Sequence, residues 1–164
     1  MTFAPHIGGL KLATPSTLEL QLMRFFKAPR SLVFDCWTRP EMIRRWLTGP
    51  EGWTMSVCTV DLKPGGQYRY EWRHRDGPTM GLTGTFIAIA APDSLVSEER
   101  FDEDWTGGAT HNRIDFSDDA DGTLYTHTIR YTSEAARDAA MRTGMADGME
   151  AGFAHLDAVL AQAN

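Results

Sequence analysis

Residues 134–163, EAARDAAMRTGMADGMEAGFAHLDAVLAQA, predict one long amphipathic helix at the carboxyl end of the chain. Small or apolar residues recur there at the spacing of a single helical face: Met141, Gly144, Met145, Gly148, Met149, Gly152 and Leu156. Each glycine inside a helix costs about 1 kcal/mol relative to alanine, so tertiary packing must offset that cost. Glycine either lets a helix approach another surface or leaves space beside it, and methionine adapts to irregular space. The stretch therefore suggests a helix that covers a binding cavity, although close packing alone would also explain the glycines.

The residues before this helix have the pattern of strands separated by turns. Residues 17–26 alternate leucines with polar residues, and residues 67–75 alternate aromatic with charged side chains, as half-buried strands do. Two short helices are predicted after the first strand, one starting near Pro29 and one over residues 41–46. The other predicted strands are residues 53–61, 81–90, 95–101, 109–116 and 123–131. This order predicts an α+β fold, with an antiparallel sheet of about seven strands and one face of that sheet against the long helix.

The chain is long enough to form a single domain with its own core. Its 164 residues are predicted to divide into a flexible N-terminal leader, residues 1–16, and one domain over residues 17–164. The leader is expected because its prolines and glycines interrupt any periodicity. The cysteines, Cys36 and Cys58, lack CxxC or metal-type spacing and are expected to be reduced, buried thiols rather than a disulfide.

Charge and hydropathy favour a cytoplasmic protein that binds neither nucleic acid nor membranes. The chain has 16 Lys and Arg against 22 Asp and Glu, a formal net charge of −6, which argues against a general binder of polyanions. No apolar run reaches transmembrane length, and the N-terminus lacks the basic and apolar regions of a signal peptide. A homodimer is plausible, but the sequence indicates no interface.

Several stretches, in this order, resemble the START-like (SRPBCC) superfamily, in the branch related to the activator of a heat-shock chaperone ATPase. They run from about Leu18 to Leu160 and are Arg24-Phe25, Ala28-Pro29, Val33-Phe34, Thr38-Arg39-Pro40-Glu41, Trp46, residues 61–69 (DLKPGGQYR), Asp76-Gly77, Gly84, Glu99-Arg100-Phe101, residues 105–108 (WTGG), Gly122-Thr123 and residues 133–138 leading to Gly144-Met145. The resemblance implies a helix-grip fold, in which a curved antiparallel sheet wraps the C-terminal helix and leaves a cavity between them. Members include ligand carriers, cyclases and aromatases of polyketide-type substrates, and chaperone activators, so the resemblance implies no particular chemistry.

The last predicted hairpin places one histidine on an otherwise apolar face. If one face of the hairpin points inward, that face carries Asn112, Ile114, Phe116, Tyr125, His127, Ile129 and Tyr131. His127 could then orient a ligand, or act as an acid or base near neutral pH, which makes it the candidate catalytic residue. The alternative is a core histidine hydrogen-bonded to Tyr125, Tyr131 or the backbone, since buried polar groups generally find partners. The family pattern has an aliphatic residue at this position, so the resemblance implies no catalytic role for His127.

Aromatic residues on the strands supply a candidate lining for the cavity. Tyr70 and Trp72 share one strand face with Tyr68 and His74, which fits a stacking wall for a flat ligand or an ordinary sheet core. Trp46 and Trp53 flank the loop over residues 49–52 and are expected at the cavity mouth, with Trp105 as another candidate for the rim. The predicted ligand-binding residues are Trp46, Trp53, Tyr70, Trp72, Phe86, Tyr125, His127, Met145 and Met149.

These patterns favour binding of a small hydrophobic or aromatic ligand between the helix and the sheet. No metal or cofactor is expected, because the histidines lack HxH or HExxH spacing and no glycine pair has the spacing of a phosphate loop. Two alternatives stay open. One is a cyclase-like or aromatase-like enzyme on a polyketide-type substrate, with His127 and a tyrosine as acid–base groups but no carboxylate clearly placed beside them. The other is an interaction domain that activates a chaperone ATPase.

Overall fold

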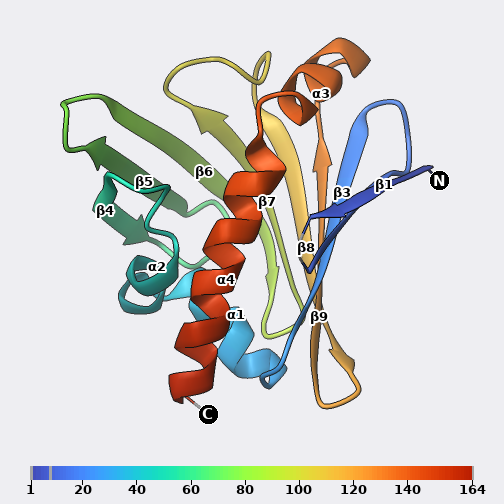
Figure 1. Cartoon of the computed structure of the whole chain (residues 1–164), viewed down its shortest axis with the longest axis vertical. Coiled ribbons are helices and arrows are strands. Elements are labelled where there is room, and N and C mark those ends of the chain that lie inside the picture. Colours follow the sequence, from blue (N-terminus) through green and yellow to red (C-terminus); the bar gives the residue numbers. More distant parts are fainter. Residues whose placement is uncertain (1, 8, 164) are drawn as a thin grey trace.

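The computed structural model describes residues 2–7 and 9–163. In this part of the chain one antiparallel sheet contains nine strands in the order β1-β2-β3-β9-β8-β7-β6-β5-β4. The sheet curves around helix α4, with α1 and α2 toward the C-terminal end of α4 and α3 at its N-terminal end (Figure 1). The elements are β1 (Thr2–Ile7), β2 (Leu10–Thr14), β3 (Glu19–Phe26), α1 (Arg30–Thr38), α2 (Pro40–Trp46), β4 (Trp53–Val60), β5 (Gln67–His74), β6 (Thr79–Ala90), β7 (Ser94–Phe101), β8 (Thr110–Asp119), β9 (Gly122–Arg130), α3 (Glu134–Met141) and α4 (Met145–Ala163).

The predicted α+β helix-grip fold is confirmed, and alternation in the sequence locates its strands well. Each of the seven predicted strands is present, with ends shifted by only a few residues. The last hairpin has the predicted inward face: Phe116, Tyr125 and Ile129 are buried, whereas Arg113 and Arg130 are exposed. β3 pairs with β9 so that Leu22 lies opposite His127 and Arg24 opposite Tyr125.

The N-terminal segment differs from the prediction, because the expected leader contains β1 and β2. β1 pairs with β2, and β2 pairs with β3, so the two strands extend the sheet beyond the predicted seven. Leu10, Leu12 and Ala13 are buried, which supplies apolar contacts that hold β2 on the sheet. The prediction of a segment without regular structure is therefore wrong for residues 2–7 and 10–14, while residues 1 and 8 lie outside the described residues.

The C-terminal segment also differs, because α3 and α4 replace the single predicted helix. Ser133 caps α3 by accepting a hydrogen bond from the backbone N–H of Ala136 at 3.0 Å. Gly144 has a φ of 79°, a left-handed conformation that ends the α3 segment and redirects the chain into α4. Met141 lies on α3 and is 37% exposed, so it does not belong to one continuous helical stripe with Met145 and Met149.

The two halves of α4 pack differently. In the C-terminal half, Phe153, Leu156, Val159 and Leu160 are buried in the main core. The Phe153 ring lies edge-on to Phe26 and Tyr125, with centroid distances of 5.6 and 5.3 Å. In the N-terminal half, Gly148 presents no side chain to the sheet. The C-terminal half of α4 is therefore buried in the core, whereas Met145, Ala146 and Met149 of its N-terminal half are only partly buried against it.

A buried arginine links the sheet to α4. Arg24, on the inner face of β3, is 8% exposed, and its Nε donates to Glu150 Oε1 at 2.6 Å. Its Nη1 and Nη2 each donate to Asp157 at 2.9 Å, and its guanidinium lies over the rings of Phe26 and Phe153. Gly9 lies close to this group, since a Cβ added there would lie 3.3 Å from Arg24 Nε. Both carboxylates hold the pKa of Arg24 above its usual range, although burial opposes them.

We expect Arg24→Ala to lower the free energy of unfolding by about 3 kcal/mol, because it leaves Glu150 without its partner in a mostly buried position. Urea unfolding followed by circular dichroism measures the change. Arg113→Ala is the control, since Arg113 pairs with Asp115 on the exposed side of the sheet and its loss should cost less than about 0.5 kcal/mol. Equal effects of the two substitutions would show that Arg24 does not anchor α4.

The two glycines on either side of the start of α4 should respond oppositely to alanine. Gly144→Ala forces a Cβ into a left-handed conformation and should destabilise the protein by about 1 kcal/mol. The Cβ added by Gly148→Ala would meet no atom within 4 Å, so this substitution should stabilise α4 by up to about 1 kcal/mol. Thermal unfolding of the two variants tests this difference, and a loss of stability in Gly148→Ala would contradict an open space at this position.

A candidate ligand-binding cavity

A cavity of about 360 Å³ lies between α4, the inner face of the sheet and the loop after α2. Eight of the nine predicted ligand-binding residues line it: Trp46, Tyr70, Trp72, Phe86, Tyr125, His127, Met145 and Met149. The lining is mostly aromatic and aliphatic, with a small number of polar groups, as in typical sites for small molecules. The sequence patterns thus locate most of the lining correctly, and a binding role for these residues stays a prediction.

Trp53 is the predicted residue that the structure does not bring to the cavity. It lies at the start of the edge strand β4, opposite His74 of β5, and its ring packs edge-on against His74 at 5.3 Å. The loop beside it contributes Gly49 and Pro50 to the lining instead. Trp105, the other candidate for the rim, does line the cavity, is 36% exposed and packs on Phe101 at 4.7 Å.

Gly148 and Gly152 of α4 have enough room for a larger residue, and Gly148 is exposed. A Cβ added at Gly148 would meet no atom within 4 Å, and one added at Gly152 would reach Trp46 only at ordinary contact distances of 3.8–4.0 Å. Neither position therefore needs glycine to let the helix approach the sheet. Both glycines line the cavity, so the absence of side chains there enlarges it.

Hydrogen bonds hold two of the tryptophan walls in place. Trp46 donates its indole N–H to Cys36 O at 2.8 Å, and Trp72 donates to Leu47 O at 2.9 Å. Trp37 stacks on Tyr125 with ring centroids 4.8 Å apart and an interplanar angle of 26°. These contacts keep the aromatic rings from collapsing into the space between the helix and the sheet.

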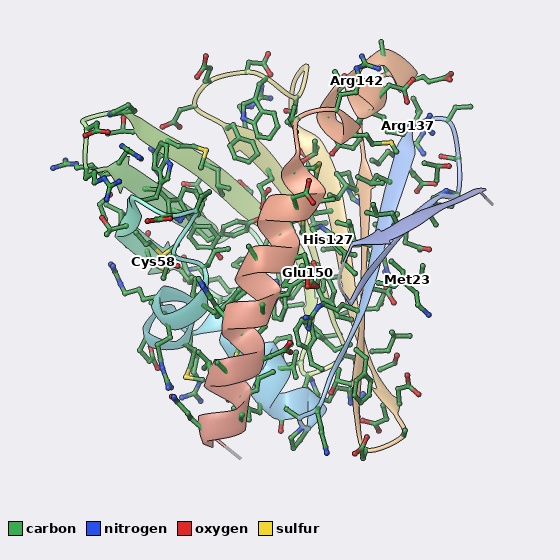
Figure 2. The ribbon with its side chains drawn as sticks, viewed as in Figure 1. Met23, Cys58, His127, Arg137, Arg142 and Glu150 are labelled. Atoms are coloured by element: carbon green, nitrogen blue, oxygen red, sulfur yellow. The ribbon has the colours of Figure 1, made fainter. Side chains whose placement is uncertain are left out.

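His127, on β9 behind α4 (Figure 2), is bonded at both ring nitrogens. Asn112 uses its amide N–H groups on the backbone oxygen and hydroxyl of Thr110, so its Oδ1 must accept from His127 Nε2 at 2.8 Å. His127 Nδ1 then accepts from the Tyr125 hydroxyl at 2.7 Å. Burial lowers the pKa of His127 to about 4, which keeps the ring neutral near pH 7. The histidine thus has the hydrogen bond to Tyr125 anticipated for a core residue, and neither nitrogen is free for proton transfer.

Glu99 is a cavity residue that the sequence analysis did not select. It lies on the inner face of β7 with Leu95, Ser97 and Phe101, and its Oε2 accepts a hydrogen bond from the Tyr68 hydroxyl at 2.7 Å. Burial raises the pKa of its carboxyl group, and the Tyr68 hydrogen bond opposes that effect. The alternation of residues 95–101 could have revealed it. Glu99 occupies one of the alternate positions that point toward the inner face of the strand.

The remaining reactive groups of the described residues do not form a second centre. Cys36 and Cys58 are both free and buried on different elements, and burial raises the pKa of the Cys36 thiol to about 11. No three His, Cys, Asp or Glu side chains come together as metal ligands within residues 2–7 and 9–163. No helix in the same part of the chain combines the length and apolarity needed to cross a bilayer.

We expect His127 to make the protein less stable as the pH falls. The unfolded histidine takes up a proton near pH 6.5 but the folded one only near pH 4, so stability present above pH 6.5 is lost progressively between these values, by up to about 3 kcal/mol. Urea unfolding at intervals from pH 7 to pH 4 measures this loss. His127→Gln should remove this part of the pH dependence, whereas His111→Gln, at an exposed position of β8, should retain it. Identical pH profiles for wild type and His127→Gln would contradict the assignment of a neutral, buried ring.

Comparison with known proteins agrees with this fold. A crystal structure of a protein from Rhodobacter sphaeroides is similar to the chain, with 32% identity, a TM-score of 0.89, and coverage of 94% of this chain and 99% of that one. A solution structure from Arthrobacter aurescens has 27% identity and a TM-score of 0.78, covering 92% of this chain and 91% of its own. A crystal structure from Nitrosomonas europaea, at 23% identity and a TM-score of 0.79 over 91% of this chain and 97% of that one, shares the fold.

The sequence comparisons identify the family. No curated protein matches the chain. The family model for Activator of Hsp90 ATPase homolog 1-like protein matches residues 27–161, which span the structure from the end of β3 to the end of α4. The chain therefore belongs to the family of Activator of Hsp90 ATPase homolog 1-like proteins, within the START-like superfamily.

Proposed function

We propose that this protein binds a small hydrophobic or aromatic molecule in the cavity between α4 and the sheet. The observation that carries the proposal is a cavity walled mainly by aromatic and aliphatic side chains, with the exposed Gly148 at its edge. A volume of about 360 Å³ lies within the range of small-molecule sites. Apolar side chains that line such a space present surface that an apolar ligand would remove from water.

The composition of the walls indicates the kind of occupant. Trp37, Trp46 and Trp72 supply broad aromatic faces, and Met145 and Met149 supply adaptable side chains from α4. Such walls favour a flat, apolar molecule over a sugar or a nucleotide, which need many polar partners. The few polar groups in the lining would orient the ligand rather than supply most of its affinity.

The two alternatives have weaker support. The cyclase-like or aromatase-like hypothesis relied on His127 for proton transfer, and both nitrogens of that ring are bonded to other side chains. The chaperone hypothesis draws on the description of the matching family, and no feature of the described surface favours it over ligand binding. Ligand binding is therefore the function that the geometry supports best.

Blocking the cavity should remove the ligand without unfolding the protein. We expect native mass spectrometry of wild-type protein purified from its source cells to show an additional non-covalent mass. Gly148→Phe should lose that mass, because its ring enters the space beside α4. Ala158→Phe is the matched control, since Ala158 is exposed on the same helix and its substitution should retain the mass.

Circular dichroism must show that both variants remain folded. A wild-type protein without any bound mass, or a folded Gly148→Phe variant that still carries it, would contradict the proposed site.

A further inference from the structure

We propose that the ligand of this cavity is a hydrophobic amine whose protonated nitrogen pairs with the carboxylate of Glu99. This inference rests on the proposed function, since it assigns a chemical class to the occupant of the same cavity. It arises from a carboxylate that lies on the cavity wall, where the described residues give one of its oxygens no hydrogen bond and place no cation beside it.

A hydrogen-bond chain positions the Glu99 carboxylate. The Tyr68 hydroxyl gives its single proton to Glu99 Oε2 at 2.7 Å, so the Ser97 hydroxyl, 3.0 Å away, must donate to the Tyr68 oxygen. Both donors point along the chain toward Glu99, an arrangement that stabilises a negative charge there. Gly84 makes room for the Tyr68 ring, because an added Cβ would lie only 1.9 Å from it. The chain therefore fixes one carboxylate oxygen and leaves the other, Oε1, without a hydrogen bond in the described structure.

The described residues provide no positive charge to balance Glu99. The cavity lining contains no lysine or arginine, and none of the ion pairs among residues 9–163 includes Glu99. His127, the one histidine in the lining, is held neutral by its bonds to Tyr125 and Asn112. An ionised carboxylate in an apolar cavity is costly without a counterion. A cationic ligand would remove that cost, and an alcohol or a carboxylic acid would not.

The rings around Glu99 also suit a cation. Tyr70 packs between Tyr68 and Trp72, with ring centroids 5.2 and 6.0 Å away, and all three rings line the cavity. Aromatic faces attract ammonium groups, most strongly where water is excluded. The Tyr70 hydroxyl has no hydrogen-bond partner among the described residues, and burial raises its pKa, with a further contribution from the Glu99 charge. Its oxygen is thus a second acceptor for an N–H of the ligand.

Three ligands that share a naphthalene ring but differ in charge test whether the charge contributes to binding. We would measure the dissociation constants of naphthalen-2-ylmethylamine, naphthalen-2-ylmethanol and 2-naphthoic acid at pH 7 by isothermal titration calorimetry. The amine should bind at least about tenfold more tightly than the alcohol, because a hydrogen bond to a charged group contributes more than a neutral one. The acid should bind most weakly, because its charge repels Glu99.

Substitution of Glu99 then tests the assigned partner. Glu99→Gln keeps an oxygen for the Tyr68 hydroxyl and should lower the affinity for the amine by about tenfold while leaving that for the alcohol nearly unchanged. Glu98→Gln, at the neighbouring exposed position of β7, is the control and should change neither affinity. If Glu99→Gln does not fold, the relative affinities of the wild-type protein for the three ligands still test the proposal.

The outcomes distinguish the two proposals. Equal affinities for the amine and the alcohol, each abolished by Gly148→Phe, would overturn the role of Glu99 and leave ligand binding in the cavity supported. Binding of none of the three ligands would count against both proposals.

Discussion

Arg24 ties the inner face of the sheet to α4 through Glu150 and Asp157, and the position of the helix depends on this contact. An arginine on an apolar strand face is costly to bury unless its donors are paired, and here both carboxylates come from one helix. The contact therefore fixes α4 along its length and in its rotation about its own axis. With the helix held in this way, the space beside Gly148 stays open instead of being closed by movement of α4 toward the sheet.

The same rotation decides which side of α4 faces the cavity. Glu150 and Asp157 point toward Arg24, while Met145, Gly148, Met149 and Gly152 line the cavity. The C-terminal half of the helix completes the core through Phe153 and Leu156, which are almost fully buried. One helix thus completes the core at one end and lines the cavity at the other, so substitutions in the two halves should have different consequences.

The sequence predicted the strands and most of the cavity lining because both depend on local alternation. Half-buried strands need one apolar and one polar face, and this period is visible in residues 67–75 without any knowledge of their partners. The first two strands escaped prediction because Leu10, Leu12 and Ala13 are too few to establish a period. The division of the C-terminal segment into two helices at Gly144 was not predicted, because the spacing of this glycine fits a helical stripe. Its left-handed conformation is a property of the folded chain.

Errors within the cavity have similar causes. Glu99 was overlooked because a carboxylate is normally solvated, and its inward position is tolerated only through Tyr68 and Ser97. Trp53 was placed at the cavity mouth because it flanks a loop with Trp46, but it lies at the start of an edge strand, where its ring packs on His74. In both cases side-chain partners distant in sequence decide the outcome, and a single sequence does not contain their geometry.

The proposed binding site requires that α4 leave a space lined by apolar side chains beside Gly148. A crystal structure under xenon pressure tests it most directly, because xenon occupies dry apolar cavities without specific chemistry. We expect xenon between Gly148 and the rings of Trp37 and Trp72, and none at that position in Gly148→Phe. A structure in which α4 lies against the sheet, with no xenon beside Gly148, would contradict it.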